Sequence, residues 1–169
     1  MIVPFPAPAV PESDPINFGD LSPEINDLLQ KGVIAYRRDF TAAEKFFREA
    51  LDTNPEELPT YFCLYKIHTY HGNLDEARAA AQTGMLKAAR QAGWPDDWRE
   101  WTPQATPQGE IPDGPARFAL YTLKALAFIS LRRDEKAAAE EILTALRQLD
   151  PSGAVGWPVI AELAAGLGR

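Results

Sequence analysis

A pattern of small and bulky apolar residues recurs along this chain at an interval of 34 residues. Ala43, Phe47 and Ala50 follow one another at spacings of four and three, which places them on one face of a helix. Adding 34 to each number leads to a second set of small residues, Ala77, Ala81 and Gly84. A single helix pair with this pattern cannot bury its apolar face alone. The recurrence therefore predicts stacked copies of one helical unit.

A third copy follows later in the chain, after an insertion. From Ala43 to Ala139 is 96 residues, which equals two periods of 34 plus 28. The excess predicts an insertion rich in Trp and Pro over residues 92–119. We expect repeats at about 24–57, 58–91 and 120–153, followed by a short C-terminal helix over 155–167 that covers the face a fourth repeat would have covered.

Capping residues and prolines predict where the helices begin and end. Ser22-Pro23 opens the first helix, and Asp39 with Phe40 marks a short turn. Asn54-Pro55 is expected to close the second helix and to open the third, while Asn73 and Glu76 resemble a capping box. Helices are then expected over about 41–53, 57–71, 74–91, 115–132, 134–149 and 157–166, with a short turn of helix at 96–101 and no strand.

Residues 1–21 are predicted to form an extended, proline-rich arm ahead of a domain that covers 22–169. Its prolines remove backbone donors and helical torsions, so polyproline II or coil is expected. The arm also carries apolar side chains that could dock, or it could remain a free tail. The prolines and the absence of a basic start also argue against a signal peptide. The prolines are Pro4, Pro6, Pro8, Pro11 and Pro15, and the apolar residues are Ile2, Val3, Phe5 and Val10.

Composition narrows the class of protein. The chain has 17 Lys and Arg against 24 Asp and Glu, a net charge of −7, which disfavours binding to nucleic acid. One cysteine cannot form an internal disulfide, which fits a reducing compartment. The sequence holds no apolar run long enough to span a membrane. We therefore expect a cytoplasmic protein with no nucleic-acid or membrane partner.

Residues 39–55, which read DFTAAEKFFREALDTNP, resemble the tetratricopeptide repeat (TPR) family. The match lies in the spacing Ala43-x3-Phe47-x2-Ala50 and in the terminal Asn54-Pro55. These correspond to the small residue, the aromatic and the proline of the family motif. The copies also depart from the family: the turn between Tyr36 and Phe40 is about one residue short. Ala81 stands where an aromatic is common, and Asp134 replaces a turn glycine. The resemblance implies an all-α helical solenoid of about three TPR-like helix hairpins.

TPR proteins bind peptides in a concave groove lined by the first helix of each pair, and the resemblance implies such a groove here. Aromatic and basic side chains suit an apolar peptide or helix with acidic or C-terminal charge, whereas the alternative is that they are ordinary core. Leu28, Gly32 and Cys63 occupy positions where the carboxylate-clamp subfamily has Asn and Lys or Arg, so chaperone C-termini are an unlikely ligand. The groove residues are Tyr36, Phe62, Lys66, Tyr70, Tyr121, Lys124, Phe128 and Arg132, beside Leu28, Gly32, Ala35 and Thr69.

Three tryptophans gather in the insertion, and two roles are open for them. Trp94, Trp98 and Trp101 have spacings of four and three, so a helical turn would align them. They could form an aromatic lid over the groove. The favoured alternative is that they pack the insertion onto the helices as a small separate core.

Catalytic motifs are lacking. Cys63, His68 and His71 lie on one predicted helix, but Cys63 and His68 point to different faces, so a metal site is not expected. Phosphate-binding glycine loops and nucleophile motifs are absent from the sequence. We expect no enzyme activity and no cofactor.

Three functions remain open at this stage. The first is a protein-interaction scaffold, an adaptor or assembly factor that binds a partner segment. The second is a cytoplasmic chaperone for a secreted or cofactor-containing client, a class that this chain resembles in length and charge. The third is a self-associating structural module, a possible homodimer, in which the N-terminal arm is swapped between subunits. The arm could also be a ligand of this chain's own groove or of the groove of a second copy.

Overall fold

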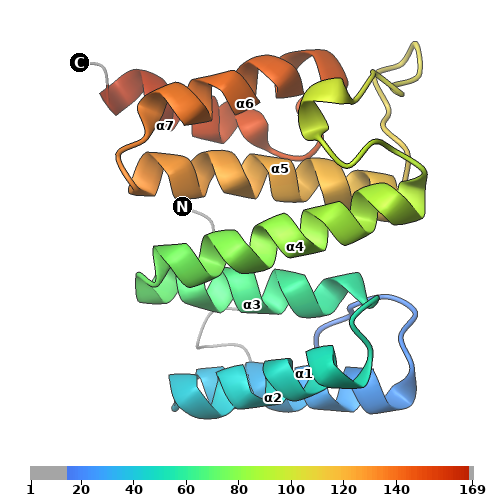
Figure 1. Cartoon of the computed structure of the whole chain (residues 1–169), viewed down its shortest axis with the longest axis vertical. Helices are drawn as coiled ribbons and strands as arrows, with labels where there is room; N and C mark the ends of the chain where they lie inside the picture. The colour runs from blue at the N-terminus through green and yellow to red at the C-terminus, as the bar shows by residue number, and fades with distance from the viewer. Residues whose placement is uncertain (1–14, 168–169) are drawn as a thin grey trace. The chain divides into compact units, whose positions relative to one another are not determined.

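A computed structural model describes residues 15–167, and this part is helical without strands (Figure 1). Most of the predicted arm lies outside the described residues. The expected all-α class is confirmed, and most helix boundaries agree within two residues. The elements are α1 (Pro23–Tyr36), α2 (Phe40–Thr53), α3 (Leu58–His71), α4 (Leu74–Ala92), a three-residue 3₁₀ helix η1 (Trp98–Glu100), α5 (Pro115–Arg132), α6 (Lys136–Leu149) and α7 (Trp157–Leu167).

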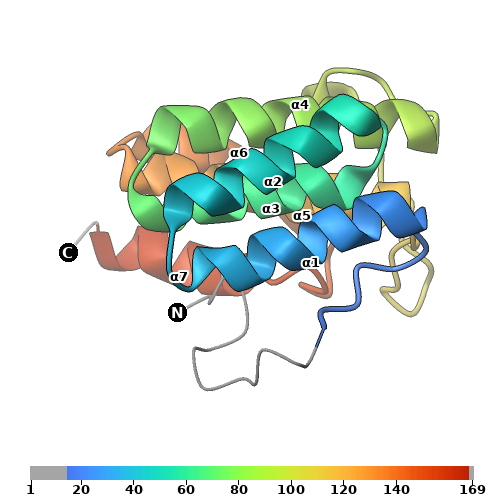
Figure 2. The same cartoon turned by 90° about the horizontal axis from the view of Figure 1, so that it is seen from below.

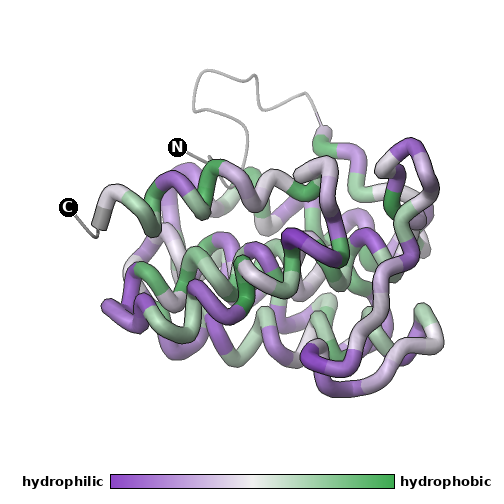
Figure 3. The backbone as a smooth tube through the Cα atoms, turned by 90° about the horizontal axis from the view of Figure 1, so that it is seen from above, coloured by the Kyte–Doolittle hydropathy of each residue, from purple (hydrophilic) through white to green (hydrophobic). Residues whose placement is uncertain are grey.

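The chain divides into two compact units, Met1–Ala80 and Ala81–Arg169, and the boundary falls inside α4. In the first unit, α1 packs on α2 and α2 packs on α3 (Figure 2). Figure 3 shows hydrophobic and hydrophilic residues interspersed along the helices of the chain, as expected for helices that each have one buried face. Ile25 and Leu29 of α1 and Phe47 of α2 are fully buried between them.

A close approach between α1 and α2 depends on Gly32. A Cβ atom at this position would overlap the ring carbons of Phe47, which is fully buried. The missing side chain therefore lets the Phe47 ring lie directly against the α1 backbone. Gly32 was expected in the groove, but it faces α2.

Two local signals were interpreted incorrectly at the helix ends. Phe40 is the first residue of α2 rather than part of a turn, because the Asp39 carboxylate caps the helix by accepting from the Ala42 N–H at 3.2 Å. Asn54 ends α2 but does not cap α3, which begins at Leu58. The Asn54 Oδ1 instead accepts from the Glu56 N–H at 3.0 Å, which closes a turn of its own.

Two helices end in the same way although their sequences differ. Gly72 follows α3 with φ of 85°, and the Asn73 N–H reaches back to the His68 carbonyl at 2.8 Å. Asp134 follows α5 with φ of 61°, and the Glu135 N–H reaches the Ser130 carbonyl at 2.9 Å. Both are Schellman-type ends, which need a left-handed residue. Asp134 thus occupies the conformation that glycine has after α3.

In the second unit, α5 packs on α6, and α7 contacts both helices. Ile160 and Ala164 of α7 are fully buried. The fully buried Asp150 holds the turn before α7, since its carboxylate accepts from the N–H groups of Ala154 at 2.9 Å and Val155 at 3.0 Å.

The small and bulky residues that defined the repeat are core residues. Ala43, Ala77 and Ala139 are fully inaccessible to solvent. The residues four positions later, Phe47, Ala81 and Leu143, are also fully buried. The spacing thus identified equivalent buried positions on α2, α4 and α6.

Candidate functional site

The first candidate surface is one face of α3, formed by Phe62, Lys66 and Tyr70. Their spacing of four residues aligns them along the helix, and we call them the α3 face. The Lys66 Nζ lies 5.4 Å from the centre of the Phe62 ring, a cation–π distance. Phe62 also makes an edge-on contact with Tyr65, with ring centres 5.7 Å apart. The α3 face therefore places a cation beside an aromatic ring.

Lys66 is unusual because it is a buried lysine. Only 6% of the residue is exposed, whereas Phe62 and Tyr70 are partly exposed. Burial lowers the pKa of the Lys66 ammonium from 10.5 to about 8. At neutral pH the group is therefore mostly protonated, and it retains a positive charge in a poorly hydrated position. Such a charge interacts strongly with an anion that comes within reach.

The second candidate surface, in the other unit, is one face of α5. Tyr121, Lys124, Phe128 and Arg132 lie along this helix at spacings of three and four, and we call them the α5 face. The Lys124 Nζ lies 3.8 Å from the centre of the Tyr121 ring, and the Arg132 Cζ lies 5.9 Å from that of Phe128. Lys124 is 3% exposed. The α5 face thus repeats the aromatic–cation pairing of the α3 face.

Each face combines features that suit an acidic, partly apolar segment. Aromatic rings provide a large rigid contact area, and the cations can bind carboxylates. Tyr36, the last residue of α1, is partly buried, and burial raises the pKa of its phenol. Burial likewise raises the pKa of Tyr121. The phenols stay neutral at physiological pH, so the positive charge of the two faces comes from the lysines and Arg132.

The three tryptophans of the insertion make different contacts. Trp101 is 7% exposed, its indole N–H donates to the Pro95 carbonyl at 2.8 Å, and its ring lies 5.1 Å from that of Trp94. Trp98 instead lies under the Arg99 guanidinium at 4.5 Å. The 3₁₀ helix spans only three residues, so it does not align all three rings. Trp101 is thus packed within the insertion, whereas the lid stays a prediction for Trp94 and Trp98.

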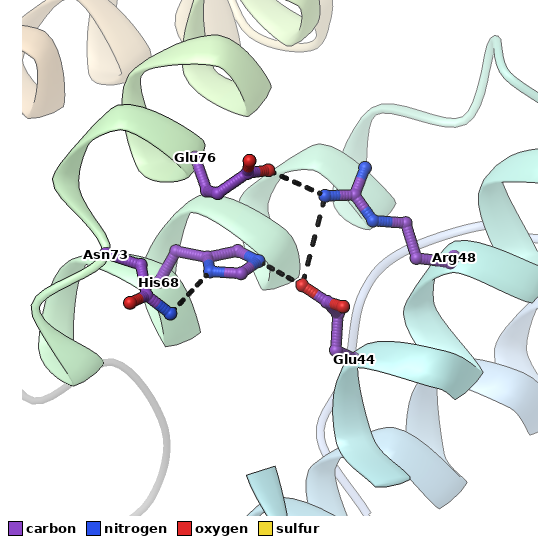
Figure 4. Close-up of polar contacts among 5 residues, drawn as sticks. All are labelled: Glu44, Arg48, His68, Asn73 and Glu76. Carbon is purple, nitrogen blue, oxygen red and sulfur yellow. Dashed lines mark hydrogen bonds and ion pairs between the residues drawn. The ribbon is translucent and has the colours of Figure 1, made fainter. Parts of the chain in front are cut away.

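A polar cluster around His68 was not anticipated (Figure 4). The His68 Nε2 lies 2.5 Å from a Glu44 carboxylate oxygen, and its Nδ1 lies 3.2 Å from the Asn73 Nδ2. Arg48 joins the cluster through Glu44 at 3.9 Å and Glu76 at 3.3 Å. No spacing rule links Glu44 to His68, because they come from different helices. Only the packing of α3 on α2 brings them together.

The two histidines of α3 differ in their surroundings, since His68 belongs to the polar cluster and His71 stacks on an aromatic ring. Burial lowers the pKa of His68 despite the neighbouring Glu44, which acts in the opposite direction. The Phe40 ring meets His68 edge-on at 5.3 Å and stacks on His71 at 4.1 Å. Among residues 15–167, no group of three or more His, Cys, Asp or Glu is arranged to hold a metal ion. The His68 cluster joins α2, α3 and the start of α4.

The comparisons with known proteins give no relative for this chain. No protein-family model, curated protein or solved structure matches it. Within the described helices, none is both long and apolar enough to cross a membrane.

Proposed function

We propose that this chain is a non-enzymatic, TPR-type helical-repeat protein that binds a segment of a partner protein, as an adaptor or assembly factor. The α3 face and the α5 face are the proposed binding surfaces. The buried, aromatic-stacked lysine on each face is the observation that carries the proposal, because desolvating a lysine costs stability that a purely structural residue would not require.

The repeat pattern supports the choice of class. Helix pairs α1–α2 and α5–α6 are packed hairpins, and equivalent small residues are buried in α2, α4 and α6. In such scaffolds the first helix of each pair presents side chains for binding. The α3 and α5 faces lie on first helices in this scheme. The chemistry of the faces favours a partner segment with aromatic or aliphatic residues beside Asp, Glu or a C-terminal carboxylate.

A library of phage-displayed random peptides tests the proposal with the intact chain. Peptides selected on the wild-type protein should be rich in acidic and apolar residues. Their affinity, measured by fluorescence anisotropy, should fall at least about tenfold in a Lys66→Met, Tyr70→Ala double variant, which corresponds to about 1.4 kcal/mol.

The control for that experiment is Lys45→Met, which removes an exposed lysine from α2. This variant should bind the peptides as the wild type does. Circular dichroism must show unchanged helix content in both variants. A double variant that keeps its helix and its affinity would place binding elsewhere on the molecule and refute the proposal.

A further inference from the structure

The turn between α3 and α4, within the first unit, is held by both the backbone and the side chain of His68. The Asn73 N–H donates to the His68 carbonyl at 2.8 Å, and the Asn73 carbonyl accepts from the Ala77 N–H at 2.9 Å. The Asn73 Nδ2 also lies 3.2 Å from the His68 Nδ1 (Figure 4). Asn73 therefore contacts His68 twice, and its carbonyl makes a hydrogen bond with the first turns of α4.

The Asn73 contact determines where the His68 ring carries its proton. An amide nitrogen has two hydrogens and no free lone pair, so the Asn73 Nδ2 can only donate. The His68 Nδ1 therefore accepts, which leaves the proton of the neutral ring on Nε2. The Nε2 atom is inaccessible to solvent and lies 2.5 Å from a Glu44 carboxylate oxygen. This one tautomer thus suits Asn73 on one side of the ring and Glu44 on the other.

The charged groups around His68 come from two other helices. In the part of the chain that the structure describes, they are Glu44 and Arg48 of α2 and Glu76 of α4, and α1 contributes none that acts on the ring. Arg48 lies 3.9 Å from Glu44 and 3.3 Å from Glu76. Burial, the largest effect, lowers the pKa of His68, the two carboxylates raise it, and Arg48 lowers it. The folded protein therefore holds the ring neutral near neutral pH.

A second proton on the His68 ring can bind only at Nδ1, because Nε2 already carries a hydrogen. The new N–H would face the Asn73 Nδ2, and two donors cannot form a hydrogen bond. The Asn73 amide must then turn over to present its oxygen, or move away from the ring. A cationic His68 also attracts Glu44 and repels Arg48. Protonation thus breaks the present contact at the turn, while it strengthens the contact to α2.

We propose that His68 is an acid-sensitive link between α2 and the turn that joins α3 to α4. With a neutral ring, His68 connects Glu44 to Asn73. A proton on Nδ1 releases Asn73, so that the turn and the first residues of α4 open more readily in mild acid. This regulation does not depend on the proposed peptide binding, because the residues of the link are not those of the α3 face.

The direction of the pH dependence follows from the lowered pKa. The pKa of His68 in the folded chain lies below its ordinary value of 6.5, so the unfolded chain binds more protons below pH 6.5. The stability that depends on a neutral His68 is therefore intact above pH 6.5, and it is lost as the pH falls toward the lower pKa of the folded chain. Opening of the turn should follow the same course.

Nitrogen NMR of the histidine rings tests the tautomer in the full-length chain. At about pH 7.5, where neutral histidine dominates, the ¹⁵N shifts of His68 should identify Nε2 as protonated and Nδ1 as an acceptor. His71, which is exposed, gives the other set of ring signals, and the variant His71→Gln assigns them. A proton on Nδ1 of the neutral His68 would mean that Asn73 does not donate to it, and would overturn the proposal.

Amide hydrogen exchange tests the opening of the turn. The protection factors of the Asn73 and Ala77 amides, which correct for the intrinsic effect of pH, should fall several-fold between about pH 7.5 and about pH 5. The Asn54 N–H, which donates to the Ala50 carbonyl at 3.0 Å, is the internal control at the end of α2 and should keep its protection. Protection that falls equally at all three amides, or at none of them, would refute an acid-sensitive link.

Two substitutions separate this link from a histidine that is merely buried. His68→Gln keeps a donor and an acceptor but cannot titrate, so the protection of Asn73 should no longer fall in acid. Asn73→Asp places a carboxylate beside Nδ1, which should raise the pKa of His68 and reduce the acid-induced loss of protection at position 73.

The matched control is His71→Gln, which removes the neighbouring histidine and should respond to acid as the wild type does. Circular dichroism must show unchanged helix content in each variant. If Asn73→Asp leaves the pKa of His68 unchanged, the two side chains are not coupled and the proposal is wrong. That result does not depend on whether His68→Gln folds.

Discussion

Gly32 shows how much one residue can constrain the packing of two helices. Replacement by alanine favours a helix by about 1 kcal/mol where space is free. In α1, however, the added Cβ meets the Phe47 ring, which has no room to retreat because it is fully buried. We expect Gly32→Ala to lower the free energy of unfolding by about 1–3 kcal/mol. Urea denaturation followed by circular dichroism measures this change.

Gly166 offers the matched control, since it lies in α7 and a Cβ there meets no atom within 4 Å. Gly166→Ala should leave stability unchanged or raise it by up to about 1 kcal/mol. If both substitutions had the same effect, the contact between α1 and α2 would be looser than described.

Lys66 provides a second test at the scale of one residue. The pKa of Lys66 is lowered from 10.5 to about 8 in the folded protein. Between pH 8 and pH 10.5 the lysine is therefore mostly protonated in the unfolded chain and mostly neutral in the folded one. Stability should therefore rise from pH 8 to pH 10.5, by on the order of 3 kcal/mol in total, since one pKa unit corresponds to about 1.4 kcal/mol. Lys66→Met should remove this slope and be more stable than the wild type at pH 7. Urea midpoints across this pH range measure both effects, and an unchanged slope would contradict the lowered pKa.

At the scale of a helix end, Asp134 can be compared directly with Gly72. Both have a positive φ and both are followed by the same backward hydrogen bond, but only Gly72 lacks the steric cost of a Cβ. Asp134→Gly should therefore raise the free energy of unfolding by about 0.5–1 kcal/mol. Gly72→Ala, where a Cβ meets no atom within 4 Å, should lower it by a similar amount through the backbone alone. Thermal melts of the two variants should shift in opposite directions, and equal shifts would exclude the shared geometry.

Helix boundaries were predictable because their signals are local. Pro115 and the pair Ser22-Pro23 marked two starts correctly, and Gly72 marked an end. The start of α3 was predicted wrongly at Asn54-Pro55, because an asparagine side chain can either cap a following helix or close a turn. The choice depends on contacts outside the segment, such as the bond from the Tyr61 hydroxyl to the Pro55 carbonyl at 2.6 Å.

At the scale of the molecule, the sequence predicted which residues are buried better than which residues meet. The 34-residue recurrence identified Ala77 and Ala139 as core. The lysines over aromatic rings, Lys66 and Lys124, were named as groove residues only through the TPR resemblance, and their burial was not predicted. The contact of Glu44 with His68 and that of Gln30 with Ile16 escaped detection, since both join segments whose distance in sequence follows no helical period.

The last expectation concerns how the two units unfold. Helix α4 crosses their boundary without interruption, and it has buried residues on both sides, including Ala77 in the first unit and Ala88 in the second. In repeat proteins, a shared element of this kind couples the stability of neighbouring units. All four tryptophans lie in the second unit, at 94, 98, 101 and 157, so their fluorescence reports on that unit alone. Gly32→Ala destabilises the first unit, and we expect it to lower the urea midpoint of tryptophan fluorescence together with that of circular dichroism. If the fluorescence midpoint instead stays at the wild-type value while circular dichroism separates into two transitions, α4 does not couple the units.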